Sequence, residues 1–173
     1  TASVTVATTI GVTYFIQLHR RSGNNGAAMA GTVCVYAGAA SGGNHNIGTG
    51  NLTTCASTGL FDTGGAGGAY SISETITETY CSSAAGQCLS INFTAFATES
   101  CCDQLSIYDG PNTASPLIGT YQGTVSPGTV TSSAGCLTFE WTSAGYITAA
   151  GWEATMTCVA CPTCTDLVQN GKV

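Results

Sequence analysis

Charged residues are scarce in this chain of 173 residues. Asp, Glu, Lys and Arg make up only 7% of it, whereas roughly 25% is usual in soluble proteins. Three basic residues stand against nine acidic ones, which gives a net charge of -6. The chain therefore lacks the positive surface that nucleic-acid phosphates require, and we expect no nucleic-acid partner. Its hydrophobic content of 43% also excludes disorder of the highly charged kind.

Long apolar runs are absent as well. No stretch reaches the roughly 20 apolar residues that a membrane-spanning helix needs, so we expect no membrane span. The chain does not open with basic residues followed by an apolar run, as a secretory signal peptide does. This beginning predicts a mature or trimmed segment.

Residues that could carry catalysis are few. The two histidines, His19 and His45, fall in Gly- and Asn-rich segments that predict exposed loops. No G-x-S-x-G nucleophile elbow, H-E-x-x-H zinc motif or phosphate-binding glycine loop occurs. The sequence therefore predicts a protein that is not an enzyme.

Cysteine, in contrast, is abundant. An even and dense set of cysteines predicts disulfides and an oxidising, extracellular compartment. The spacing Cys158-x2-Cys161-x2-Cys164 raises zinc as an alternative, but no second pair of ligands follows it, so disulfides are favoured. The ten cysteines are Cys34, Cys55, Cys81, Cys88, Cys101, Cys102, Cys136, Cys158, Cys161 and Cys164.

Short strand-like segments separated by turn residues dominate the chain. The run 1–18 is rich in Val, Thr, Ile, Tyr and Phe and is broken by Gly11, which predicts two strands. Apolar and polar residues alternate over 88–96, as in a half-buried strand. A loop rich in Gly and Asn is expected at 38–51. Because no segment has helical periodicity, the sequence predicts an all-β antiparallel sandwich with little helix.

Four segments carry a resemblance to a known family. They read FDTGGAGGAYS (61–71), INFTAF (91–96), CCDQLSIYDGPN (101–112) and GWEATMTC (151–158). In this order and spacing, residues 53–158 resemble a CUB domain, of the kind found in secreted multi-module surface proteins of Bacteroidetes-type bacteria. The resemblance implies a jelly-roll-like sandwich of two antiparallel sheets, which is the class that the strand pattern also predicts.

The resemblance implies part of the disulfide pattern. Cys55 and Cys81 lie 26 residues apart, similar to the first disulfide of the family, and are expected to pair. The second bridge of the family lacks one of its two cysteines here. The pairings that remain open are Cys101 or Cys102 with Cys88 or Cys136, and Cys88 with Cys136.

Many CUB domains hold calcium beside the loops that bind their ligands, through a Glu and two Asp side chains. Glu99 and Asp103 match the first two of these residues, whereas Ala144 stands where the third carboxylate belongs. Calcium prefers six to eight oxygen ligands. The resemblance therefore implies a weak calcium site at best, or else two side chains that hydrogen-bond their own loop. Tyr146, in the same late loop, is the candidate for contact with a protein or glycan ligand.

The beginning of the chain resembles a different family. Residues 11–38 are similar to the closing hairpin of a PPC-like sandwich (bacterial pre-peptidase C-terminal), a frequent neighbour of CUB modules. A long apolar strand with an unpaired backbone is adhesive, because its N–H and C=O groups require partners. We therefore expect the run 1–18 to add to a sheet of another copy or module. The apolar residues expected in this assembly are Val4, Val6, Ile10, Val12, Tyr14 and Ile16.

Three regions with different roles are predicted. Residues 1–51 form an N-terminal β extension, residues 52–158 the CUB-like sandwich, and residues 159–173 a Cys-containing tail. The predicted protein is a secreted or cell-surface, non-catalytic structural or adhesive module that self-associates into a fibre or pilus-like assembly by strand addition. Two alternatives stay open: a calcium-assisted module that binds a protein or glycan, and an accessory segment of a larger secreted hydrolase.

Overall fold

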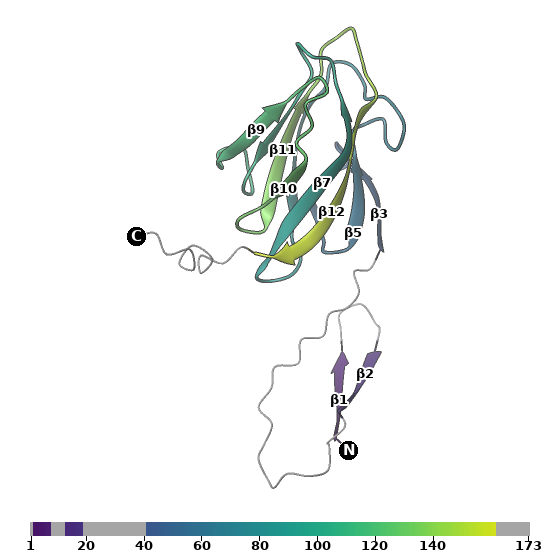
Figure 1. Ribbon diagram of the computed structural model, residues 1–173, viewed down its shortest axis with the longest axis vertical. Coiled ribbons are helices and arrows are strands. Elements are labelled where there is room, and N and C mark those ends of the chain that lie inside the picture. Colours follow the sequence, from purple (N-terminus) through teal and green to yellow (C-terminus); the bar gives the residue numbers. More distant parts are fainter. Residues whose placement is uncertain (1, 8–12, 19–40, 162–173) are drawn as a thin grey trace, which may run out of the picture. The chain divides into compact units, whose positions relative to one another are not determined.

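The computed structural model describes residues 2–7, 13–18 and 41–161. The chain divides into two compact units, Thr1–Tyr36 and Ala37–Val173. In the first unit, β1 (Ala2–Ala7) and β2 (Thr13–Leu18) pair as an antiparallel two-stranded sheet (Figure 1). The predicted pair of strands around Gly11 is thus present, and each of the two strands is the other's partner.

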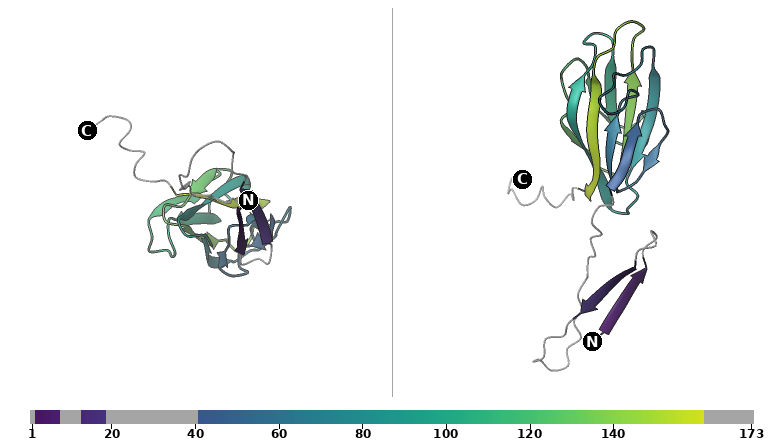
Figure 2. Two further views of the ribbon diagram at one scale, coloured as in Figure 1. Left: turned by 90° about the horizontal axis from the view of Figure 1, so that it is seen from below. Right: turned by 90° about the vertical axis from the view of Figure 1, so that its right-hand side faces the viewer.

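The second unit is a sandwich of two five-stranded sheets (Figure 2). The strand order is β10-β7-β12-β5-β3 in the first sheet and β4-β6-β11-β8-β9 in the second. Neighbouring strands are antiparallel except for two parallel pairs, β3–β5 and β4–β6. This architecture confirms the predicted all-β sandwich, and the described residues contain no helix that could cross a membrane. The strands are β3 (Ser41–Asn46), β4 (Leu52–Thr53), β5 (Ser57–Phe61), β6 (Thr75–Cys81), β7 (Gln87–Ala97), β8 (Gln104–Tyr108), β9 (Leu117–Tyr121), β10 (Thr129–Thr131), β11 (Cys136–Thr142) and β12 (Gly151–Ala160).

Large aromatic and aliphatic side chains fill the space between the sheets. On β7, the apolar residues of the alternating pattern are buried, as that pattern predicts. Phe139 on β11 contacts Phe93 from β7 and Trp152 from β12 across the core, with ring centroids 6.0 Å apart in both pairs. Full burial of one such side chain contributes roughly 1.5–3 kcal/mol. The aromatic cluster therefore fixes how the two sheets face each other.

The loop predicted at 38–51 is wrong for residues 41–46, which form the edge strand β3. The glycines and asparagines there suggested a turn, but the backbone pairs with β5 in parallel, so tertiary pairing outweighs local preference. The side chain of His45 on β3 is only 14% exposed, so the prediction of an exposed loop imidazole is wrong. His19 lies outside the described residues.

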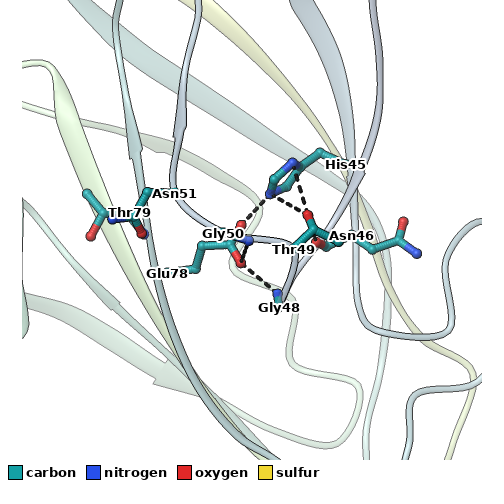
Figure 3. Close-up of polar contacts among 8 residues, drawn as sticks. All are labelled: His45, Asn46, Gly48, Thr49, Gly50, Asn51, Glu78 and Thr79. Atoms are coloured by element: carbon teal, nitrogen blue, oxygen red, sulfur yellow. Dashed lines mark hydrogen bonds and ion pairs between the residues drawn. The ribbon is translucent and has the colours of Figure 1, made fainter.

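His45 belongs to a polar cluster that joins the two sheets (Figure 3). Its Nε2 pairs with the carboxylate of Glu78, which is buried on β6 in the other sheet. Glu78 also accepts hydrogen bonds from the backbone N–H groups of Gly48 at 2.6 Å and Gly50 at 3.3 Å. Burial, and secondly the negative charge of Glu78, raise the pKa of Tyr80 well above its ordinary value. The cluster fixes the crossing segment 47–51 between β3 and β4.

The disulfides correct the predicted pairing of Cys55 with Cys81. Cys81 at the end of β6 lies in register with Cys136 at the start of β11, and these two cysteines are bonded. Cys55 bonds instead to Cys158 near the end of β12. The sequence separation of 26 could not reveal which strand ends lie side by side. Four disulfides are present in the described residues: Cys55–Cys158, Cys81–Cys136, Cys88–Cys161 and Cys101–Cys102.

The pairings left open for the other sandwich cysteines are also wrong, because Cys101 and Cys102 bond to each other and Cys88 bonds to Cys161. Cys34 and Cys164 lie outside the described residues. Ser82 directly follows Cys81 in the chain. Its hydroxyl lies 3.2 Å from the Cys55 sulfur and 3.4 Å from the Cys158 sulfur. The disulfides that link strands therefore gather at one end of the sandwich.

We predict that the Cys55–Cys158 bridge stabilises the fold, whereas the Cys101–Cys102 bridge does not. Removing the first with Cys55→Ala/Cys158→Ala is expected to lower the free energy of unfolding by about 3–5 kcal/mol, since it closes a long loop. The matched variant Cys101→Ala/Cys102→Ala opens no loop and is expected to change it by less than about 0.5 kcal/mol. Urea unfolding of both variants measures the difference, and equal losses would contradict this assignment.

Candidate functional site

Four loops meet at one end of the sandwich (Figure 1), and the register places the disulfides that link strands at the other end. The register shows this, because Thr142 at the end of β11 pairs with both Thr75 and Gln104, and Gly151 pairs with Ala97. We call this surface the loop end. It consists of residues 62–74, 98–103, 122–128 and 143–150.

The carboxylate of Asp103 is the centre of the loop end. It is fully buried, and each of its oxygens accepts a short hydrogen bond. The Tyr70 hydroxyl donates to Oδ2 at 2.5 Å, and the backbone N–H of Ala144 donates to Oδ1 at 2.6 Å. Tyr70 and Ala144 belong to two other loops, so one carboxylate joins three of the four. Burying a carboxylate is costly unless such bonds compensate for the lost water.

Tyr70 extends this network to Glu99 and to the core. Its hydroxyl accepts a hydrogen bond from the Glu99 backbone N–H at 3.1 Å. Its ring packs edge-to-face against that of Trp141, with ring centroids 4.9 Å apart. Burial, followed by the hydrogen bond to Asp103, raises the pKa of Tyr70 to about 12. The phenol therefore stays protonated at neutral pH and remains a donor to the carboxylate.

The fourth loop joins the others through Thr98. Its hydroxyl donates to the Asp103 carbonyl at 3.0 Å and accepts from the Gly123 N–H at 2.9 Å. The Thr98 N–H in turn donates to the Gly123 carbonyl at 2.8 Å. All four loops are thus connected by hydrogen bonds.

Two further carboxylates, which the sequence did not point to, also accept hydrogen bonds that tie the loop end to the sandwich. Asp62 accepts from the backbone N–H groups of Trp152 at 2.7 Å and Gly64 at 2.8 Å, and burial raises its pKa. Glu74 accepts from Nε1 of Trp141 at 2.9 Å. Both acids directly follow or precede a strand, which is the only sequence signal that could have pointed to them.

The predicted ligand-contact residue Tyr146 lies on the loop end with its side chain 95% exposed. Its loop is fixed two residues earlier at Ala144, whose carbonyl accepts from the Ser73 N–H at 2.8 Å. The neighbouring aliphatic side chains Ile147 and Ile72 are 56% and 49% exposed. Apolar side chains are thus exposed on the loops 62–74 and 143–150, which are joined by a backbone hydrogen bond.

Glu99, the other predicted calcium ligand, lies with the bonded pair Cys101 and Cys102. One carboxylate oxygen of Glu99 and the two sulfur atoms all lie within 4.8 Å of one another. Both cysteines are exposed, and Glu99 is half-buried. Among the described residues, this is the one group of three side chains with metal-ligating atoms, and Asp103 is not part of it.

These residues do not fit a calcium ion. Calcium requires six to eight oxygen ligands, and tight sites use several carboxylates. Both oxygens of Asp103 already accept hydrogen bonds, one of them from the backbone N–H of Ala144. The position of the third carboxylate is occupied by Ala144, and its backbone N–H is a hydrogen-bond donor, whereas calcium requires an oxygen ligand there. Glu99 lies with two sulfur atoms, which calcium does not favour.

Comparisons with known proteins identify the fold. Residues 77–156 match the family model of the CUB domain. The full extracellular region of zebrafish Gpr126/Adgrg6 matches with a TM-score of 0.54 and 18% identity, over 63% of this chain and 14% of that one. The CUB1-EGF-CUB2 region of human MASP-1/3 matches with a TM-score of 0.54 and 17% identity, over 63% of this chain and 41% of that one.

A third solved structure, the MASP-1 CUB2 domain bound to Ca2+, has a TM-score of 0.53 and 18% identity, over 62% of this chain and 97% of that domain. No curated protein matches the chain. The sandwich is therefore of the CUB type, and the resemblance predicted over 53–158 is confirmed for residues 77–156. The PPC-like likeness of 11–38 and a bacterial origin find no support in these comparisons and stay predictions.

We predict that the Tyr70 hydroxyl stabilises the loop end through Asp103. Tyr70→Phe leaves a buried carboxylate oxygen without its donor, and is expected to lower the free energy of unfolding by about 2–3 kcal/mol. The matched control is Tyr108→Phe, whose hydroxyl donates to Glu140 at 2.7 Å near the surface. Because water can replace that donor, we expect a loss below about 1 kcal/mol. Equal losses in denaturant unfolding would rule out a special role for Tyr70.

Proposed function

We propose that the sandwich is an extracellular, non-catalytic protein-binding module and that its loop end is the binding surface. The observation that carries this proposal is Tyr146, which is 95% exposed on a loop whose preceding backbone is anchored at Ala144. An aromatic side chain has few rotatable bonds, and an anchored backbone leaves less of its loop to be ordered when a partner covers it; such residues often dominate binding energy. Disulfide-rich CUB domains are typically extracellular, which agrees with the four disulfides between residues 55 and 161 of the described part of the chain.

A protein ligand fits the loop end better than a glycan. Sugar rings stack on aromatic faces, and within residues 42–161 Tyr146 is the one strongly exposed aromatic side chain. Its exposed neighbours Ile72 and Ile147 are aliphatic and offer no further stacking surface. Aliphatic groups around an aromatic anchor are instead typical of protein interfaces.

The non-catalytic role has its own support. His45 is the one histidine in the described residues, and it is bonded to Glu78. The buried carboxylates of the loop end are occupied by donors from the protein itself. The alternative of an accessory segment of a larger secreted hydrolase rests on no described residue and stays a prediction.

We infer that hydrogen bonds, not calcium, order the loops of this module. The MASP-1 CUB2 domain was solved with Ca2+ bound. In this chain, Tyr70 and Ala144 donate to the carboxylate that a calcium ion would use. The calcium-assisted alternative is therefore less well supported than binding that needs no metal.

Replacing Tyr146 is expected to abolish most ligand binding without affecting the fold. The immobilised wild-type chain and its Tyr146→Ala variant are incubated with extracellular fluid, and the captured proteins are quantified by mass spectrometry. For a protein captured by the wild type, we expect affinity to fall at least about tenfold in the variant, as for an interface hot spot. Leu117→Ala on β9, 56% exposed and away from the loop end, is the matched control. Equal capture by all three chains would refute the assignment of the surface.

A second proposal concerns the N-terminal strands, and its support is the isolated pairing of β1 with β2. The register places Val4 opposite Ile16 and Val6 opposite Tyr14, and no third strand joins them within the described ranges. A two-stranded sheet is marginally stable on its own, so a further strand from another copy would stabilise it. Of the predicted assembly residues, Ile10 and Val12 lie outside the described ranges.

This proposal predicts multimers that depend on β1 and β2. The full chain should form species larger than a monomer in multi-angle light scattering, in proportions that rise with concentration. Val4→Pro/Ile16→Pro removes two backbone N–H donors and is expected to leave monomers. Val4→Thr/Ile16→Thr keeps these donors and should still associate. A wild-type chain that stays monomeric at every concentration would exclude self-association.

A further inference from the structure

We propose that Cys101–Cys102 is a selectively reducible disulfide and that its reduced form, together with Glu99, binds a thiophilic divalent cation such as Zn2+ or Cd2+. This site is independent of the protein-binding role proposed above, since it requires neither Tyr146 nor a macromolecular partner. It rests on the accessibility of the two sulfur atoms, on their position in the fold, and on the Glu99 carboxylate, which accepts no hydrogen bond from the described residues.

Accessibility separates this disulfide from the other three that the described part of the chain contains. Cys101 and Cys102 are both exposed, whereas the cysteines of the other bridges are half-buried or buried. Thiol–disulfide exchange requires a thiolate to reach one sulfur atom of the bridge. A thiol reagent in solution is therefore expected to attack Cys101–Cys102 first.

The position of this disulfide allows it to open without loss of the fold. It joins neighbours in the chain, with a sequence separation of 1, and links no two strands. On either side of it, the loop 98–103 is held by the hydrogen bonds of Thr98 to Gly123 and of Asp103 to Tyr70. The dithiol would thus stay on an ordered loop.

Glu99 supplies the third ligand. Residues 41–161 contain eight carboxylates, and seven of these accept a hydrogen bond from the protein. Glu99 is the exception among the described residues, although its carboxylate is half-buried and close to two sulfur atoms. An oxygen without a donor in this place is available to a cation.

The separations suit a single ion. Bond lengths of about 2.0–2.3 Å place neighbouring ligands of tetrahedral zinc about 3.3–3.8 Å apart. The oxygen and the two sulfur atoms lie within 4.8 Å of one another, so rotation of the side chains suffices once the S–S bond is open. Thiolates favour soft cations over calcium, and water would complete the coordination.

The chemistry requires a small-molecule thiol as reductant. Two thiol molecules supply two electrons and two protons, so that the Cys101–Cys102 bond breaks, two cysteine thiols form, and the reagent leaves as its own disulfide. The cation then displaces the two thiol protons, which are released to solvent.

Differential labelling tests the first step on the full chain. Free thiols are blocked with one alkylating reagent, the protein is treated with increasing amounts of a monothiol, and new thiols are labelled with a second reagent and mapped by mass spectrometry. Among the four described disulfides, Cys101–Cys102 is expected to be labelled first and before unfolding. Prior release of Cys55, Cys81 or Cys88 would overturn the proposal.

Cadmium binding tests the second step. The reduced, desalted wild type should bind Cd2+ with one ion per chain and show a cadmium–thiolate charge-transfer band. The variant Cys101→Ser/Cys102→Ser should bind one Cd2+ fewer per chain and lack the cadmium–thiolate band. A band of equal intensity in this variant would refute the site. Glu99→Gln should be reduced as readily as the wild type but bind Cd2+ about tenfold or more weakly. Unchanged affinity in that variant would remove Glu99 from the site.

Discussion

The sandwich must stabilise its carboxylates without lysine or arginine, because residues 41–161 contain neither. A buried negative charge without a cation requires hydrogen-bond donors of fixed position. Backbone N–H groups, two tyrosine hydroxyls, the indole of Trp141 and the imidazole of His45 take this role. Most of these bonds join a side chain to a segment far away in the sequence, as between Asp103 and Tyr70 or Asp62 and Trp152, so the placement of the acids determines which loops and sheets are held together.

This constraint gives the two ends of the sandwich different characters. At one end, the disulfides Cys55–Cys158 and Cys81–Cys136 connect strand ends covalently. At the loop end, buried Asp103 joins three loops by hydrogen bonds, and the exposed Tyr146 follows one of its anchor points. A surface built in this way is ordered without a ligand, which would lower the entropic cost of the protein binding proposed for it.

The sequence alone was sufficient for the class of fold and for much of the core. Period-two alternation over 88–96 identifies a strand that the structure confirms as part of β7, because local periodicity and burial agree there. The disulfides could not be derived, since they depend on register, as between Cys81 and Cys136. The strand β3 was missed because pairing with β5 outweighs the turn preference of its glycines and asparagines. The roles of Asp62 and Glu74 could not be predicted either, since Asp62 accepts from Trp152, 90 residues away, and Glu74 from Trp141, 67 residues away.

We infer that hydrogen bonds to Asp103 order the loop end in place of a cation. The most direct test is the thermal unfolding midpoint of the full chain in saturating calcium and in excess chelator. A ligand that binds only the folded state raises this midpoint by mass action. We expect the two midpoints to coincide, in the wild type and in Asp103→Asn. A midpoint that rises with calcium in the wild type, and no longer does so in Asp103→Asn, would contradict the account.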